Sequence, residues 1–318
     1  MIDDFLLYEV ARDYHIENKL QREIAEKLGV SRVQVGKYLR MAQERGLVQI
    51  QVVPPRQKHG DAGRVEAFFK SEFGLKDVVT TPPSVRPDRL SVMLAAHARE
   101  YIENVLPDEP LNIGFGWGTT MYQVAHAPSQ VVRKRWRIVP VSGGSSRISD
   151  KHFNINHIIH TFAESCQAQA NPVYLPFWAE TLALEAIRRS EDYSRTMELW
   201  DNLDVLISSV GYDLARSPLF RDGVINGARL DELENRRVVG DVATHYYDIN
   251  GNEHQADFAH STINISMDQI RAAGKRIIVA GGFHKVESIL GLLRLGIADV
   301  LIIDVKTAET VMDYVLQG

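Results

Sequence analysis

The stretch NIGFGWGTTMYQVA, residues 112–125, contains three glycines and two threonines between an apolar run and a run with helical spacing. A short apolar strand that ends in a glycine-rich loop and leads into a helix is typical of α/β proteins. The N–H groups of such a loop and the positive end of the helix dipole both favour a bound anion. The stretch therefore predicts an α/β domain with an anion site after this strand.

The same alternation of strands and helices continues on both sides of this stretch. It predicts a mostly parallel sheet covered by helices. We expect strands at residues 77–81, 111–115, 137–141, 173–176, 204–210, 276–280 and 299–304. We expect helices at residues 88–105, 118–126, 155–169, 179–190, 285–295 and 306–316.

Glycine-rich loops follow three of these strands: GWGTT at 116–120, SGGSS at 142–146 and GGFHK at 281–285. Ligands of parallel sheets gather at the carboxyl ends of the strands, so the three loops predict one anion pocket with Lys285 as its full charge. No loop has the Gly-Lys-Ser/Thr spacing of a nucleotide-binding loop, and Thr119 stands near where a dinucleotide fingerprint needs its third glycine. We expect no cofactor.

The first sixty residues predict a separate helical unit. FLLYEVARDYHIE, residues 5–17, has apolar residues at helical spacing. These residues, Phe5, Leu6, Tyr8, Val10 and Ile16, are broadly compatible with one face of the helix.

Two short helices with a glycine turn between them follow at residues 20–46. Gly29 turns the chain at no steric cost, Ser31 stands at the N-cap of the second helix and Gly46 ends that helix. This spacing predicts a helix-turn-helix. The alternating run LVQIQV, residues 47–52, predicts a strand and therefore a winged variant.

The second of these helices is expected to read double-stranded DNA. Between Ser31 and Lys58, six lysines or arginines stand against one acidic residue, in a chain of net charge −5. Long polar side chains on such a helix can reach base edges and phosphates. The alternative is an ordinary helical hairpin with a solvated basic face. We predict DNA contacts from Ser31, Arg32, Gln34, Lys37, Tyr38 and Arg40.

Length and composition are those of an ordinary globular chain. Its 318 residues, 45% hydrophobic and 24% charged, leave room for two domains. The single cysteine, Cys166, excludes an internal disulfide and is expected in the core. The acidic start argues against a signal peptide, and no apolar run approaches the length of about 18 residues that spans a membrane. These features predict a cytoplasmic protein without a membrane partner.

The run VPPRQKHGDAG, residues 53–63, mixes proline, glycine and charge with little apolar content. Such a composition is typical of a boundary between domains. We therefore predict a helix-turn-helix domain at 1–53, a linker at 54–63 and a ligand-binding and oligomerisation domain at 64–318.

Over nearly its whole length the chain resembles the SorC/DeoR-type family of bacterial sugar-responsive transcription regulators. The resemblance implies an effector domain similar to sugar-phosphate isomerases and deaminases, without enzymatic activity. It implies a regulator of a carbohydrate-catabolism operon, homodimeric or homotetrameric, whose binding to operator DNA is controlled by a sugar or sugar phosphate. The matching segments are residues 22–50, GFGWGTT at 114–120, VPVSGGSS at 139–146, VVGDVATHYYDINGN at 238–252 and a closing block at 279–312.

The resemblance also implies roles for individual residues of the effector site. Asp241 is expected to accept hydrogen bonds from sugar hydroxyls, and Lys285 is expected to pair with a phosphate. The remaining positions implied to line the site are Gly116, Gly118, Thr119, Thr120, Ser142, Gly143 and Gly144.

Two positions depart from the family pattern. Ser142 stands where the family often has a basic residue that contacts the ligand, and Phe283, followed by His284, stands where an acidic residue is often found. Ser142 argues against a strongly held phosphate and against a covalent imine with the sugar. The effector is then less charged or differently placed.

Two other functions remain open. A sugar-phosphate isomerase or deaminase needs an acid–base pair, for which Asp241 and His284 are the candidates. A constitutive DNA-binding protein would have a vestigial pocket. His157 and His160 stand at the spacing of a metal pair, but no third ligand has a recognisable spacing, so no metal is expected.

Overall fold

The computed structural model describes residues 3–17, 19–48, 60–83, 86–145, 153–221, 223, 228–256 and 260–317. The chain divides into two compact units, Met1–Arg56 and Gln57–Gly318. Residues 60–63, which we expected in the linker, belong instead to the first turn of helix α4 (Gly60–Phe73). Among the described residues, no helix combines the length and apolar character needed to cross a bilayer.

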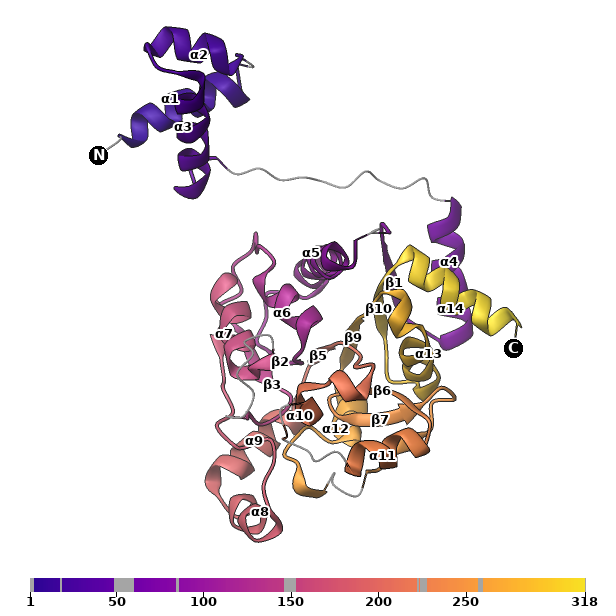
Figure 1. Cartoon of the computed structure of the whole chain (residues 1–318). Helices are drawn as coiled ribbons and strands as arrows, with labels where there is room; N and C mark the ends of the chain where they lie inside the picture. The colour runs from indigo at the N-terminus through magenta and orange to yellow at the C-terminus, as the bar shows by residue number, and fades with distance from the viewer. Residues whose placement is uncertain are drawn as a thin grey trace. The chain divides into compact units, whose positions relative to one another are not determined.

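The N-terminal unit is built from three helices, α1 (Asp4–His15), α2 (Gln21–Leu28) and α3 (Arg32–Glu44), drawn in indigo and violet in Figure 1. Gly29 has a φ of +66° and turns the chain between α2 and α3, as expected. The hydroxyl of Ser31 accepts a hydrogen bond from the N–H of Gln34 at 3.2 Å and so caps α3. The core of the unit contains Leu7, Val10, Ala11, Ile24, Ala25, Val35, Leu39 and Ala42.

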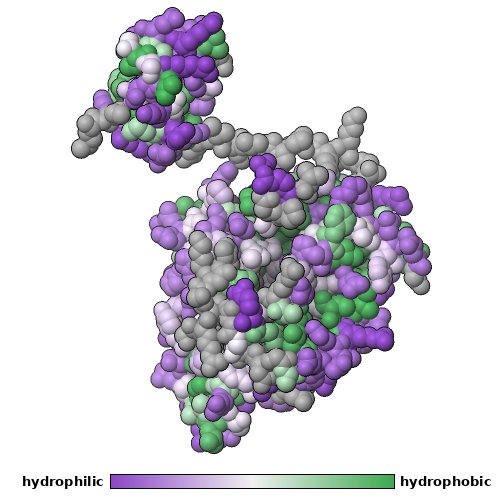
Figure 2. Space-filling model, viewed as in Figure 1, coloured by the Kyte–Doolittle hydropathy of each residue, from purple (hydrophilic) through white to green (hydrophobic). Residues whose placement is uncertain are grey.

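The apolar residues that the sequence groups on one face of α1 are only partly the ones that the helix buries. Phe5, Tyr8 and Ile16 are 66%, 46% and 69% exposed, whereas Leu7 and Ala11 join Val10 in the core. The true stripe follows the i, i+3, i+4 spacing of a helix, and the larger aromatic residues lie outside it. Figure 2 shows apolar residues among mostly hydrophilic ones on the visible face of this unit. The expected wing at 47–52 falls mainly on residues 49–52, which lie outside the described residues.

The C-terminal unit is organised around a seven-stranded, fully parallel sheet in the order β1-β10-β9-β5-β2-β3-β4. Six of the expected strands are present within two residues at each end. The seventh prediction, 173–176, was wrong, because that segment contributes only an isolated bridge between Gly144 and Pro176. The strands are β1 (Asp77–Thr81), β2 (Leu111–Phe115), β3 (Trp136–Pro140), β4 (Gln169–Ala170), β5 (Val205–Ser208), β9 (Lys275–Val279) and β10 (Val300–Asp304).

Helices cover both faces of this sheet, as expected for parallel strands. Figure 1 shows α5, α6 and α7 along one side and α4, α13 and α14 along the other. Two separate apolar clusters fill the two interfaces. Cys166 is buried at the C-cap of α7, which ends four residues before its predicted end. The helices are α5 (Pro87–Val105), α6 (Thr119–His126), α7 (Ile155–Ser165), α8 (Thr181–Arg188), α9 (Glu191–Asp201), α10 (Pro218–Arg221), α11 (Ala228–Asn235), α12 (Met267–Ala272), α13 (Val286–Leu295) and α14 (Val305–Gln317).

A second, antiparallel sheet was missed by the sequence analysis. It consists of β6 (Val238–Val242), β7 (His245–Asp248) and β8 (Glu253–His254). The residues Ala243 and Thr244 join β6 to β7, so the turn carries none of the glycine or asparagine that signals a hairpin in a sequence. This small sheet brings Asp241 to the carboxyl ends of the parallel strands.

Candidate functional site

A cavity of about 190 Å³ lies beyond the carboxyl ends of β2, β5 and β9, three neighbouring strands at the middle of the sheet. From β2 the chain proceeds outward to β3 and β4, then returns on the other side to β5. This reversal of strand order is where open α/β sheets place their ligands. The cavity is lined by Trp117, Gly118, Thr119, Thr120, Phe153, Ser208, Ser209, Val210, Gly211, Tyr212, Ser217, Pro218, Asp241, Ala243 and Lys285.

The loop after β2 supplies the N-terminus of α6 to this cavity. Gly118 has a φ of +108° and is the N-cap of the helix, so Thr119 and Thr120 are its first two residues. The first N–H groups of a helix have no partner within it and carry its partial positive charge. Gly116 does not line the cavity. It permits close packing, because a Cβ there would lie 2.7 Å from the hydroxyl of Ser208.

Lys285 supplies a full positive charge to the cavity. Its side chain is buried, and Nζ donates a hydrogen bond to the carbonyl oxygen of Val210 at 3.1 Å. Nζ also lies 5.5 Å from the ring centre of Tyr212. Burial lowers the pKa of Lys285 to about 8, against the attraction of Asp241, which raises it. The ammonium form therefore predominates at neutral pH.

Asp241 lines the same cavity from the end of β6. Burial raises its pKa to about 6, although the N–H of Thr244, His245 and Lys285 all act to lower it. The Thr244 N–H donates to Oδ2 at 3.0 Å. The backbone N–H of Gly211 donates to the Asp241 carbonyl at 2.8 Å. Asp241 is thus fixed beside the loop after β5.

The loop after β5 and three aromatic residues were not identified from the sequence as part of the site. Trp117 and Phe153 pack edge to face with ring centres 5.7 Å apart, and Tyr212 adds a third ring to the cavity lining. The hydroxyl of Ser209 is buried and has no hydrogen-bond partner among the described residues. The expected strand at 204–210 ends at Ser208, so the Ser-Ser pair at its end was the available signal.

The loop at Ser142, Gly143 and Gly144 does not line the cavity. The N–H of Gly143 donates to Ile263 at 2.9 Å, and the N–H of Gly144 donates to Leu175 at 2.9 Å. Ser142 is buried and forms an antiparallel bridge with Asn264. These amides, expected to face an anion, are used to pair two other segments of the chain.

The loop after β9 contributes only Lys285 to the cavity. The N–H of Gly282 donates to the side chains of Asp304 and Thr307, at 2.9 and 2.8 Å, and is not offered to a ligand. Phe283 is 66% exposed. The ring of His284 contacts that of Tyr212 in a tilted arrangement, with ring centres 4.4 Å apart, but His284 does not line the cavity.

The histidines of α7 lie away from the cavity lining. His157 and His160 are both exposed, and the described residues hold no group of three or more side chains suited to a metal ion. Asn154 caps α7 by accepting a hydrogen bond from the N–H of His157. The amide of Asn156 bonds both backbone groups of Val173, so neither asparagine is placed toward a sugar.

In the N-terminal unit, α3 presents a basic face. Arg32, Lys37 and Arg40 are exposed, whereas Tyr38 packs partly against the core of the unit. Val33, which the sequence analysis did not select, is 71% exposed beside Arg32. A valine there offers methyl groups of the kind that contact the thymine methyl in a major groove.

Known proteins match this chain over both of its units. The family model described as "Putative sugar-binding domain" matches residues 57–313. The deoxyribonucleoside regulator of Bacillus subtilis (strain 168) is 31% identical over 97% of both chains. The sorbitol operon regulator of Klebsiella pneumoniae is 27% identical, over 96% of this chain and 97% of the regulator. The crystal structure of full-length SorC from K. pneumoniae superposes with a TM-score of 0.72 at 25% identity, and covers 98% of this chain and 99% of SorC.

Proposed function

This chain belongs to the sugar-binding-domain family of transcriptional regulators, and we propose from that membership that a phosphorylated sugar in the cavity controls its binding to operator DNA. The related regulators are named for sorbitol and for deoxyribonucleosides, so a carbohydrate-catabolism operon is the target assigned to this chain.

The observation that carries the effector class is the position of Lys285. A buried ammonium group is costly unless an anion or strong acceptors surround it, and here one neutral carbonyl is its hydrogen-bond partner among the described residues. The cavity adds the first helical residues of α6, Thr119 and Thr120. A phosphate group accepts from all three sources at once. Ser142 does not line this cavity, whose lining includes Lys285 as its cationic residue.

The sugar portion of the ligand is assigned to the part of the cavity lined by Asp241, Ser209 and the aromatic rings. Asp241 accepts hydrogen bonds from hydroxyl groups, and Ser209 offers a hydroxyl without a partner among the described residues. Trp117, Phe153 and Tyr212 supply apolar faces for the carbon skeleton. Gly116, Gly143 and Gly144 do not line the cavity, and we assign them a role in the packing of the backbone beside it.

DNA recognition is assigned to α3. Arg32, Gln34 and the exposed methyl groups of Val33 at the helix N-terminus are placed for base edges, as in other helix-turn-helix proteins. Lys37 and Arg40 are assigned to phosphates, with Ser31 at the cap. Tyr38 packs partly against the core of the unit, so only the exposed edge of its ring is left to contact DNA.

Control requires that the ligand bind two states of the protein with different affinity. In a homodimer or homotetramer, these states differ in the spacing of their DNA-binding units and so in their fit to a palindromic operator. The proposed assembly is therefore not monomeric.

A sugar-phosphate-converting activity is the second candidate. Asp241 and Lys285 line one cavity, with pKa values near 6 and 8 on either side of neutrality. Such a pair is typical of acid–base catalysis. His284, our first choice of partner for Asp241, lies outside the lining. Conversion of a panel phosphate, followed by NMR and abolished in Lys285→Met, would establish the activity.

The test is a ligand panel on the purified full-length protein. We would measure the melting temperature with 2-deoxyribose, ribose, sorbitol and glucose, each with and without its terminal phosphate. A ligand that binds only the native state raises this temperature by mass action. A rise with one phosphate and not with its neutral sugar is expected. A rise with the neutral sugar alone would contradict the assigned effector class.

The same ligand should then alter binding to a DNA duplex selected in vitro by the protein itself. A change of at least about fivefold in Kd is expected, since coupling energies between sites are usually of this size or larger. Tight ligand binding without any effect on DNA affinity would contradict the proposed control.

A further inference from the structure

Two neighbouring residues in the wall of the cavity have an unusual backbone conformation. Ala243 and Thr244 have φ angles of +47° and +66° and join β6 to β7. Two left-handed residues in a two-residue hairpin form a type I′ turn, whose favoured sequence is Asn-Gly. Alanine and β-branched threonine are strained in this conformation. The turn therefore depends on contacts from elsewhere in the chain.

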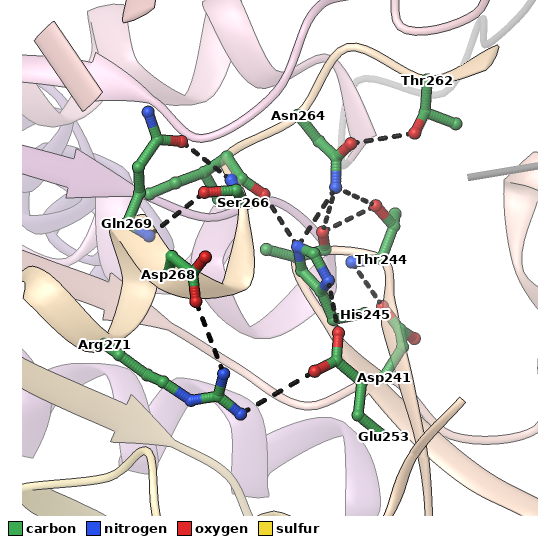
Figure 3. A network of polar contacts seen from close by, with 12 residues as sticks. Asp241, Thr244, His245, Glu253, Thr262, Asn264, Ser266, Asp268, Gln269 and Arg271 are labelled. Carbon is green, nitrogen blue, oxygen red and sulfur yellow. Dashed lines mark hydrogen bonds and ion pairs between the residues drawn. The ribbon is translucent and has the colours of Figure 1, made fainter. Parts of the chain in front are cut away.

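Asn264 provides such contacts. Its Nδ2 donates to the carbonyl oxygen of Ala243 at 3.0 Å and to the hydroxyl of Thr244 at 2.9 Å. Its side-chain oxygen accepts a hydrogen bond from the hydroxyl of Thr262 at 2.9 Å, and Figure 3 shows Asn264 between these partners. The carbonyl oxygen of Ala243 can only accept a hydrogen bond, so it fixes the orientation in which the NH₂ group of Asn264 faces the turn.

The turn in its left-handed form fixes Asp241. The N–H of Thr244 donates to Oδ2 of Asp241 at 3.0 Å (Figure 3). Opposite the turn, Gly211 leaves space for the carboxylate, because a Cβ at Gly211 would lie 1.9 Å from Oδ1. Oδ1 accepts no hydrogen bond from the described residues and is the oxygen left for a ligand.

We infer that Asn264 is a positioning residue for ligand binding: it holds the Ala243–Thr244 turn left-handed, and the turn holds the carboxylate of Asp241 in the cavity. The inference rests on the proposed function, because it concerns the affinity of the same cavity. Asn264 does not line that cavity and acts on the ligand only through the turn. A carboxylate fixed before binding loses less conformational freedom when a hydroxyl donates to it.

The loop at Ser142 and Gly143 gains a role from this arrangement. Ser142 bridges to Asn264, and Gly143 donates to the carbonyl of Ile263, so this loop places the segment that carries Asn264. The loop thus acts on the site at a distance rather than by direct contact.

The experiment compares the full-length wild type with Asn264→Ala and with the double variant Asn264→Ala, Thr244→Gly. Glycine adopts the left-handed conformation of residue 244 without strain, and Thr244, unlike Ala243, does not line the cavity. Asn252→Ala, at the next turn of the same small sheet, is the matched control. The probes are the phosphates of 2-deoxyribose, ribose, sorbitol and glucose, titrated by calorimetry.

Asn264→Ala should raise the Kd of the bound phosphate by about tenfold, and the double variant should return to within about threefold of the wild type. Wild-type affinity in Asn264→Ala, or no recovery in the double variant, would overturn the inference. A wild type that binds none of the probes contradicts the proposed function instead.

Hydrogen exchange at the Thr244 amide tests the turn without any ligand. Exchange of the residue 244 amide should be faster in Asn264→Ala than in the wild type and slow again in the double variant. Unchanged exchange in Asn264→Ala would overturn the inference on its own. Asn264→Ser serves if the alanine variant does not fold.

Discussion

The ammonium group of Lys285 lies 3.1 Å from the carbonyl oxygen of Val210, on the loop that follows the neighbouring strand. A neutral acceptor orients the ammonium group without cancelling its charge. Among the described residues, Lys285 forms no ion pair, although Asp241 acts on it at longer range. The protein therefore keeps a buried cation without an ion-pair partner among the described residues at the middle of its sheet, at a cost in stability.

Replacing Lys285 by methionine should remove phosphate binding and stabilise the fold. Its folded pKa of about 8 lies below the ordinary value of 10.5, so the charged form costs stability at every pH below about 8. The free energy of unfolding at pH 7 should rise by about 1–3 kcal/mol. Denaturant titration and calorimetry on Lys285→Met measure the two effects. The exposed Lys134→Met is the control and should change neither phosphate binding nor the free energy of unfolding. A destabilised Lys285→Met would show that the contacts of Lys285 stabilise the fold by more than its buried charge destabilises it.

Ligand affinity should be greatest between about pH 6 and pH 8. Below pH 6 Asp241 gains a proton and loses its charge, and above pH 8 Lys285 loses its proton. Each loss weakens a charge-assisted hydrogen bond to the ligand. Calorimetric titrations at half-unit steps from roughly pH 5 to pH 9 would measure the Kd across the pKa values of both groups. Lys285→Arg, whose guanidinium keeps its charge over this range, should flatten the alkaline limb and leave the acid limb, whereas an unchanged alkaline limb would assign it to another group.

Asp241→Asn should bind the ligand less tightly and yet unfold less readily. The folded pKa of Asp241, about 6, lies above 3.8, so its charge costs stability that is fully expressed above pH 6 and relieved as the pH falls. Asparagine can still accept from the N–H of Thr244. We expect a gain of about 1–3 kcal/mol at pH 7.5, measured by denaturant titration.

Asp248→Asn is the matched control for that change. Hydrogen bonds from Asn252 and Asn250 lower the pKa of Asp248, although partial burial opposes them. The charge of Asp248 therefore contributes stability at neutral pH, present above pH 3.8 and lost as the pH falls further. This variant should be destabilised at pH 7.5. Two changes of the same sign would show that charge burial does not govern the behaviour of Asp241.

The sequence was sufficient where local patterns determine structure. The run at β2 and its glycine loop predicted a strand from 111 to 115 and a helix that begins beside Gly118, and both are present. Gly29 and Ser31 likewise marked the turn and the cap of the helix-turn-helix. These signals act through backbone conformation and short-range hydrogen bonds.

The sequence was insufficient where distant segments determine structure. The glycines at 143 and 144 suggested amides free for an anion, but Ile263 and Leu175 accept from them. The turn at Ala243 and Thr244 lacks hairpin residues, and its support comes from Asn264, 20 residues or more away. No local pattern records such partners, although the second hairpin of the small sheet, β7 to β8, carries Asn250-Gly251, a turn signal that the sequence analysis did not use.

The contacts proposed for α3 can be separated by the salt dependence of DNA binding. Loss of a phosphate contact in Lys37→Ala or Arg40→Ala should reduce the slope of log K against log salt by about 1 and weaken all duplexes alike. Arg32→Ala and Val33→Ala should instead reduce discrimination between the selected duplex and single-base variants, by about 1–3 kcal/mol at the affected position for a bidentate arginine. These residues are exposed, so the fold should tolerate all four changes. Lys134→Ala, outside the N-terminal unit, should leave slope and discrimination unchanged. Equal slopes for every variant would exclude α3 as the surface that meets the phosphates.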